Sequence, residues 1–211
     1  MSNEQKMKQN AAQVHRLITE IDADPHNTEN YLRLATLLVE AGSFDQARQL
    51  LEKAQTLVEN PQDLDYDLAV CYYLQGEFTK SLQLLEQIPN DDLVLYQKAL
   101  VFLKIGQAQK ALAYALTIKK SDERVNELLG DIWLALGSDQ AAKASFEDIA
   151  PTQRTAKVNF RLGIATLASD RDQAEKYLHR AQKQDPQYFG QAQKQYAAIL
   201  KMINHTGKDN G

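Results

Sequence analysis

Residues 30–61 read NYLRLATLLVEAGSFDQARQLLEKAQTLVENP, and this stretch decides the fold. Before Gly42, apolar residues recur at helical spacing at Tyr31, Leu34, Ala35 and Leu38. After Gly42, apolar residues recur at helical spacing again, at Phe44, Ala47, Leu51 and Ala54. Pro61 ends this second stretch. The pattern predicts two helices joined by a tight turn at the glycine.

The same pattern recurs along the chain with a period in the low thirties. A small residue stands near the middle of each expected first helix, at Ala35, Ala69, Ala99, Gly130 and Gly163. In the first four copies a glycine follows seven residues later, at Gly42, Gly76, Gly106 and Gly137. A small residue lets two helices cross at short distance. Repetition of a helix–turn–helix unit at this period is typical of a solenoid, in which neighbouring repeats share one core.

These repeats closely resemble the tetratricopeptide repeat family, in the form of short bacterial-type cytoplasmic proteins built only of such repeats. The resemblance implies an all-α, right-handed superhelix of about five repeats. We expect these at residues 28–61, 62–91, 92–122, 123–155 and 156–188. Residues 1–27 are predicted to form an N-terminal capping helix, residues 189–204 a C-terminal capping helix, and residues 205–211 a disordered tail.

Several residues predict where individual helices begin and end. The pairs Asp91-Asp92 and Asp122-Glu123 stand where first helices should start, since carboxylates favour the positive end of the helix dipole. Pro89 and Pro151 predict that the second helices of repeats two and four end early.

The composition is that of an ordinary globular protein, with 44% hydrophobic and 25% charged residues. Residues 1–105 carry 9 basic and 16 acidic side chains, a balance of −7, whereas residues 106–211 carry 15 and 12, a balance of +3. Neither half is basic enough for a nucleic-acid partner. No apolar run is long enough to span a membrane, and no signal peptide is recognisable. With a single cysteine, the expected location is the cytoplasm.

No arrangement of residues indicates catalysis, a metal or a cofactor. The four histidines are dispersed, and no phosphate-binding loop is present. Cys71 lies inside an expected first helix, so we interpret it as a buried and inert thiol. We therefore expect a protein that is not an enzyme and has neither cofactor nor metal.

The resemblance implies that first helices line a concave groove, whose wall is largely apolar or aromatic. The groove-facing residues carried over from the repeat frame include Leu32, Thr36, Tyr66, Val70, Tyr73, Tyr96, Leu100, Leu103, Phe160 and Ile164. Glu127 and Asp131 occupy the corresponding positions of the fourth repeat. An exposed apolar wall of this kind marks an interaction site, unless the terminal helices cover it.

Three basic residues, Arg124, Lys157 and Arg161, complete the predicted groove. Lys157 and Arg161 are four residues apart and therefore share one face of a helix. Chaperone-binding members of the family hold a partner's terminal carboxylate with cations at this spacing and with Lys and Asn on an earlier helix. Here Tyr96 and Leu100 stand at those earlier positions, so half of the carboxylate clamp is absent. A more general contact with an acidic partner remains.

The sequence thus predicts a non-enzymatic adaptor or co-chaperone that binds a protein or peptide segment in its groove. Two alternatives stay open: a sensor of short signalling peptides, and a structural scaffold that associates with itself. The identity of the partner and the oligomeric state are not decided, with a monomer as the working expectation.

Overall fold

The computed structural model describes the backbone of residues 3–206 and the side chains of residues 10–197. Within these limits all regular secondary structure is helical, with no strand. The helices run in the order α1 (Asn3–Ala23), α2 (Thr28–Glu40), α3 (Phe44–Ala54), the short 3-10 helix η1 (Pro61–Leu64), α4 (Asp65–Leu74), α5 (Phe78–Gln87), α6 (Asp92–Lys104), α7 (Ala108–Ala115), α8 (Glu123–Ala135), α9 (Asp139–Glu147), α10 (Ala156–Thr166), α11 (Arg171–Gln184) and α12 (Pro186–Thr206).

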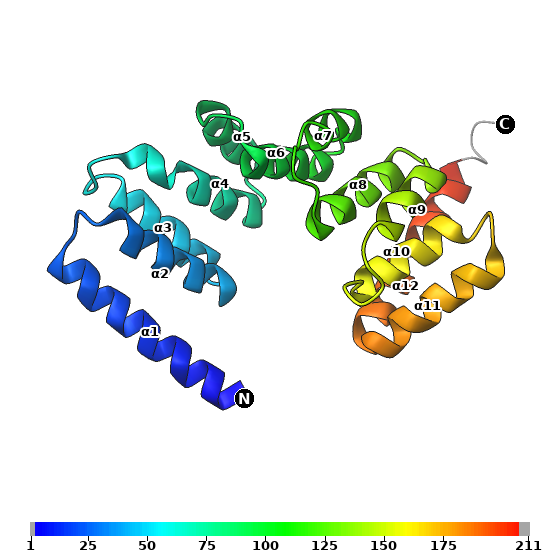
Figure 1. The fold of residues 1–211 in the computed structure, drawn as a ribbon, viewed down its shortest axis with the longest axis horizontal. Coiled ribbons are helices and arrows are strands. Elements are labelled where there is room, and N and C mark those ends of the chain that lie inside the picture. Colours follow the sequence, from blue (N-terminus) through cyan, green and yellow to red (C-terminus); the bar gives the residue numbers. More distant parts are fainter. Residues whose placement is uncertain (1–2, 207–211) are drawn as a thin grey trace. The chain divides into compact units, whose positions relative to one another are not determined.

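The chain divides into two compact units, residues 1–105 and residues 106–211. In the first unit each helix from α1 to α6 packs against the next one in the sequence, as Figure 1 shows for the hairpins α2–α3 and α4–α5. In the second unit α7 packs on α8, and the chain continues through α9, α10 and α11 in the same way. The division falls in the turn of the third expected repeat, residues 92–122.

The core of the first unit forms where small and large side chains alternate between helices. Ala47 and Ala54 of α3 are fully buried beside Leu51, and Tyr31 and Ala35 of α2 lie against them. Alanine at these points brings α2 and α3 close together, so that the larger side chains fill the space on either side. The predicted helix–turn–helix packing of residues 30–61 is confirmed.

The second unit uses glycine for the closest helix contacts. Gly130 of α8 lies directly against the ring of Phe146 in α9, and Gly163 of α10 lies against Leu178 in α11. Phe146 and Leu162 are fully buried in the same core. Gly130 and Gly163, the small residues expected at the centre of two first helices, therefore occupy helix crossings.

The four turn glycines take a left-handed backbone conformation. Gly42, Gly76, Gly106 and Gly137 have φ between 73° and 79°, and nothing lies within 4 Å of the position that a Cβ would take. Glycine is thus needed at these positions because the backbone is left-handed there, and not because a side chain would lack space.

Replacing Gly76 with alanine should lower the free energy of unfolding by about 1–2 kcal/mol, the cost of a left-handed conformation for a residue with a Cβ. Urea denaturation measures this change. Gly76→Asn should cost less, because asparagine adopts this conformation more readily. The exposed substitution Thr79→Ala is the control, with an expected change within about 0.5 kcal/mol. Equal losses for Gly76→Ala and Thr79→Ala would contradict the assignment.

The predicted helix ends are confirmed where they can be compared. A carboxylate oxygen of Asp91 accepts the N–H of Val94 at 2.8 Å, and Asp122 accepts the N–H groups of Arg124 and Val125. The second helices of repeats two and four are short, since α5 ends at Gln87 and α9 at Glu147.

The C-terminal helix differs in its bounds from the expected range of residues 189–204. It starts at Pro186, because proline fits the first turn of a helix, where its missing N–H has no partner to lose. It continues to Thr206, so the first two residues of the expected tail are helical. The rest of that tail, residues 207–211, lies outside the described residues.

Candidate functional site

Eight of the residues predicted to face the groove lie on the three first helices of the first unit, α2, α4 and α6. Helix α4 contacts both α2 and α6, so the three first helices lie side by side. Thr36 is exposed, and the other members are half-buried. We call this predicted set the α2–α4–α6 face, and its members are Leu32, Thr36, Tyr66, Val70, Tyr73, Tyr96, Leu100 and Leu103. None of the eight side chains carries a charge.

Some members of the α2–α4–α6 face also support the core. Leu32 packs on the cluster around Leu51, and Tyr66 and Tyr73 pack on the cluster around Leu85. The ring of Tyr73 lies 5.9 Å from that of Phe78 between centroids. These residues therefore contribute to stability whether or not a partner binds. Val70, Tyr96, Leu100 and Leu103 are half-buried and belong to neither of these two clusters.

The basic residues of the predicted groove lie in the second unit, and each is paired with a carboxylate. Lys157 of α10 contacts Glu127 of α8, and its Nζ is 3.9 Å from Oδ2 of Asp131. Arg161, one turn later, contacts Asp131. Burial raises the pKa of Asp131, and both cations act in the opposite direction. The positive charge expected to face a partner is thus compensated, and a partner's carboxylate would compete with Glu127 and Asp131.

Arg124 is placed differently from the other two cations. It stands at the start of α8, with its side chain 67% exposed, and its Nη2 lies 2.8 Å from Oδ2 of Asp122. Because Asp122 also caps α8, the arginine is held beside the helix start. Arg124 therefore pairs with a different carboxylate from Lys157 and Arg161.

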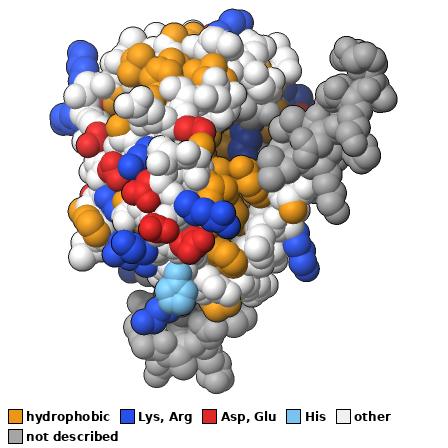
Figure 2. All heavy atoms as spheres, turned by 90° about the vertical axis from the view of Figure 1, so that its right-hand side faces the viewer, with side chains coloured by type: hydrophobic (Ala, Val, Ile, Leu, Met, Phe, Trp, Pro, Cys, Tyr) orange, Lys and Arg blue, Asp and Glu red, His pale blue; other side chains and the backbone are white. Residues whose placement is uncertain are grey.

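Acidic and basic side chains are mixed over the face drawn in Figure 2. They lie next to one another instead of separating into a positive and a negative patch. The excess of three positive charges in residues 106–211 thus forms no single basic surface on that face. This arrangement gives no electrostatic footprint for a polyanion there.

Phe160 is a correction to the predicted groove. Its side chain is only 7% exposed and is packed under α12, with ring centroids 6.3 Å from Tyr188 and 5.7 Å from Phe189. Ile164, one turn further along α10, is half-buried against the same cluster. The repeat frame identifies the side of α10 on which Phe160 lies, but α12 covers that side. Phe160 is a core residue and offers no surface to a partner.

Removal of Arg161 tests the ion pair between α8 and α10. Arg161→Met leaves Asp131 buried beside fewer cations and should cost about 1–3 kcal/mol at pH 7, less than a fully buried pair because Arg161 is 30% exposed. The loss should be smaller at pH 4, since protonation of Asp131 removes its uncompensated charge. Urea denaturation at both pH values measures the change.

The control for this variant is Arg171→Met. Arg171 also contacts a carboxylate, that of Glu175 at 3.5 Å, but its side chain is 82% exposed. Such surface pairs contribute little, so the expected change is below about 0.5 kcal/mol. If Arg161→Met changed the free energy of unfolding at pH 7 no more than Arg171→Met does, the ion pair between Arg161 and Asp131 would not contribute to stability.

The described residues contain no group of three His, Cys, Asp or Glu side chains that could hold a metal ion. Burial raises the pKa of Cys71 to about 11, so its thiol is protonated at neutral pH and is a weak nucleophile. Among the described helices, none has the length and hydropathy required to cross a membrane.

Comparison with known proteins identifies the repeat. Two family profiles, both described as tetratricopeptide repeat, match residues 7–61 and residues 63–92. The first match begins inside α1, ahead of the first expected repeat. No curated protein sequence matches the chain.

Solved structures share the fold at low sequence identity. The APC/C hetero-tetramer Cut9–Hcn1 gives a TM-score of 0.75 at 16% identity over 86% of this chain, which spans 38% of that one. PilF of Pseudomonas aeruginosa gives a TM-score of 0.71 at 16% identity, over 90% of this chain and 91% of that one. YrrB, a tetratricopeptide repeat protein with an unusual peptide-binding site, gives a TM-score of 0.56 at 18% identity, over 84% of this chain and 97% of that one. These likenesses confirm the all-α repeat fold.

Proposed function

Because the chain belongs to the tetratricopeptide repeat family, we propose that it is a non-enzymatic adaptor that binds a polypeptide segment on its α2–α4–α6 face. Proteins of this fold are in general protein-interaction scaffolds. One observation supports the location: the eight groove residues predicted in the first unit are uncharged and largely apolar, and the three helices that carry them are neighbours. Protein interfaces are depleted of charge at their centre and enriched in aromatic residues, and these eight residues include three tyrosines.

The order of the helices suggests how a segment would bind. Since α4 contacts both α2 and α6, an extended strand or an amphipathic helix could lie across the three helices. Its apolar side chains would be buried against Val70 and Leu100, and its polar side would face solvent. The peptide-binding site of YrrB supports a polypeptide as the class of ligand for this fold.

The proposal is tested by affinity capture from a cell extract with the wild type and the double variant Val70→Glu/Leu100→Glu. Two carboxylates on the α2–α4–α6 face should lower recovery of a bound protein at least tenfold. The matched control is Leu57→Glu, which places a carboxylate on a residue of the same unit that is already 43% exposed. Circular dichroism shows whether each variant is folded. Equal recovery by the wild type and a folded double variant would overturn the proposed location.

A further inference from the structure

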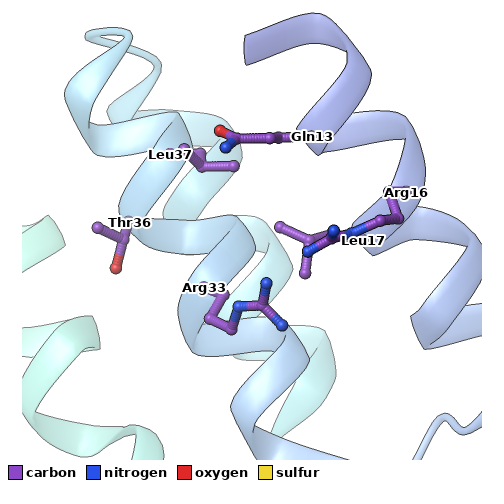
Figure 3. Close-up of a pocket in the computed structure, with 6 residues that line it drawn as sticks. All are labelled: Gln13, Arg16, Leu17, Arg33, Thr36 and Leu37. Carbon is purple, nitrogen blue, oxygen red and sulfur yellow. The ribbon is translucent and has the colours of Figure 1, made fainter. Parts of the chain in front are cut away.

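A pocket of about 250 Å³ opens between α1 and α2 in the first unit. Figure 3 shows that three of its lining residues come from each helix, and that Leu17 and Arg33 point into the space between the helices. The volume is below the roughly 300–1,000 Å³ of small-molecule sites and suits one or two side chains. The lining residues are Gln13, Arg16, Leu17, Arg33, Thr36 and Leu37.

Two arginines at this pocket share one carboxylate. Nε of Arg16 lies 3.1 Å from Oε1 of Glu20, and Nη1 of Arg33 lies 3.6 Å from Oε2 of the same residue. Among the residues that the structure describes, no other carboxylate pairs with either guanidinium. Their side chains are 62% and 43% exposed, so both remain within reach of a ligand. The pocket therefore has an excess of one positive charge, in a unit whose overall balance is −7.

The rest of the lining is apolar or neutral. Leu17 is 2% exposed and closes the pocket between the helices, and Leu37 stands beside it on α2. The Thr36 hydroxyl donates to the carbonyl of Leu32 at 2.9 Å, so its oxygen is left as an acceptor. Gln13 adds an amide with both donor and acceptor atoms. An aliphatic group and a carboxylate thus find complementary surfaces within one small pocket.

We propose that this pocket binds an acidic peptide segment in which a Glu or Asp carboxylate adjoins an aliphatic side chain. The carboxylate takes guanidinium N–H groups of Arg16 and Arg33, which form charge-assisted hydrogen bonds with it. The aliphatic side chain packs on Leu37, which lines the pocket and is half-buried, above the buried Leu17. A polyanion is disfavoured because the unit as a whole is acidic. The inference rests on the proposed function and extends it, because Thr36 belongs both to the pocket and to the α2–α4–α6 face.

The test uses the full ¹⁵N-labelled chain and two blocked tripeptides, acetyl-Leu-Glu-Leu-amide and acetyl-Leu-Gln-Leu-amide. The acidic tripeptide should shift the backbone amide signals of Leu17 and Leu37 in a saturable manner, with a Kd at least fivefold lower than that of the glutamine tripeptide. Arg16→Gln/Arg33→Gln should remove this difference. Arg171→Gln, which neutralises an exposed arginine of the other unit, should retain it. Raising the salt concentration should weaken binding of the acidic tripeptide alone.

Equal affinities for the two tripeptides, or the absence of any saturable shift, would overturn the inference. So would binding that is unchanged in Arg16→Gln/Arg33→Gln. The experiment is separable from the test of the proposed function, because Val70→Glu/Leu100→Glu should bind the acidic tripeptide as the wild type does. If the tripeptides do not bind, the affinity-capture result still tests the proposed function. If the capture finds no partner, the tripeptide titration still tests the pocket.

Discussion

Replacing Gly130 with alanine should lower the free energy of unfolding by about 3 kcal/mol, near the top of the usual range for overpacking a core. A Cβ at this position would lie 2.6 Å from Cδ1 of Phe146 and closer still to two other ring atoms. Phe146 is fully buried, so its ring cannot move aside without disturbing the rest of the core between α8 and α9. Urea denaturation of the purified variant measures the loss.

Gly190→Ala is the matched control for this substitution. Gly190 also lies within a helix, α12, but nothing lies within 4 Å of its missing Cβ. Alanine is the better helix former, so the control should be neutral or up to about 1 kcal/mol more stable than the wild type. If Gly130→Ala behaved like Gly190→Ala, α8 and α9 would not cross at the glycine, and the packing described for the second unit would be wrong.

Replacing Phe160 with alanine should cost about 3–5 kcal/mol, the usual loss for removing a buried phenylalanine side chain. Phe160 packs edge-on against Tyr188 and Phe189, so truncation would leave a cavity between α10 and α12. The same variant should recover a bound protein as the wild type does, in conditions where it is folded. Stability is measured by urea denaturation, and binding by affinity capture.

This experiment separates the predicted role of Phe160 from the role that the structure gives it. A side chain on an open groove wall would change stability by less than about 0.5 kcal/mol and would weaken binding. Leu167→Ala is the control for such an exposed position, since Leu167 follows the end of α10 and is 41% exposed. If Phe160→Ala were as stable as Leu167→Ala, Phe160 would be an exposed residue of the groove and not a core residue.

Much of the fold could be predicted from the sequence because its determinants are local. A glycine seven residues after a small residue marks a turn that needs φ near +75°, and all four such glycines have it. Asp91 and Asp122 cap helices within three residues of themselves. Ala47 and Gly130 stand at helix crossings because each repeat keeps a small residue where its two helices meet.

The candidate site was less predictable, because it depends on which elements meet across the repeats. The repeat frame gives the direction of Phe160 from α10, but it does not say that the aromatic end of α12 packs over it. Similarly, it places Lys157 and Arg161 on one face without stating what stands opposite. A signal for the ion pairs was present: Glu127 and Asp131 are also four residues apart, one repeat earlier, with the opposite charge. The pocket between α1 and α2 has no sequence signal, since it depends on the angle between the two helices.

Hydrogen–deuterium exchange, measured on the chain alone and on its complex with a captured protein, tests the central claim most directly. Binding on the α2–α4–α6 face should slow exchange in the peptides that cover α2, α4 and α6, the helices that present Thr36, Val70 and Leu100. The second helices α3 and α5 should exchange as they do in the free chain. Protection confined to α3 and α5, or to residues 106–211, would contradict the account and place the binding surface elsewhere.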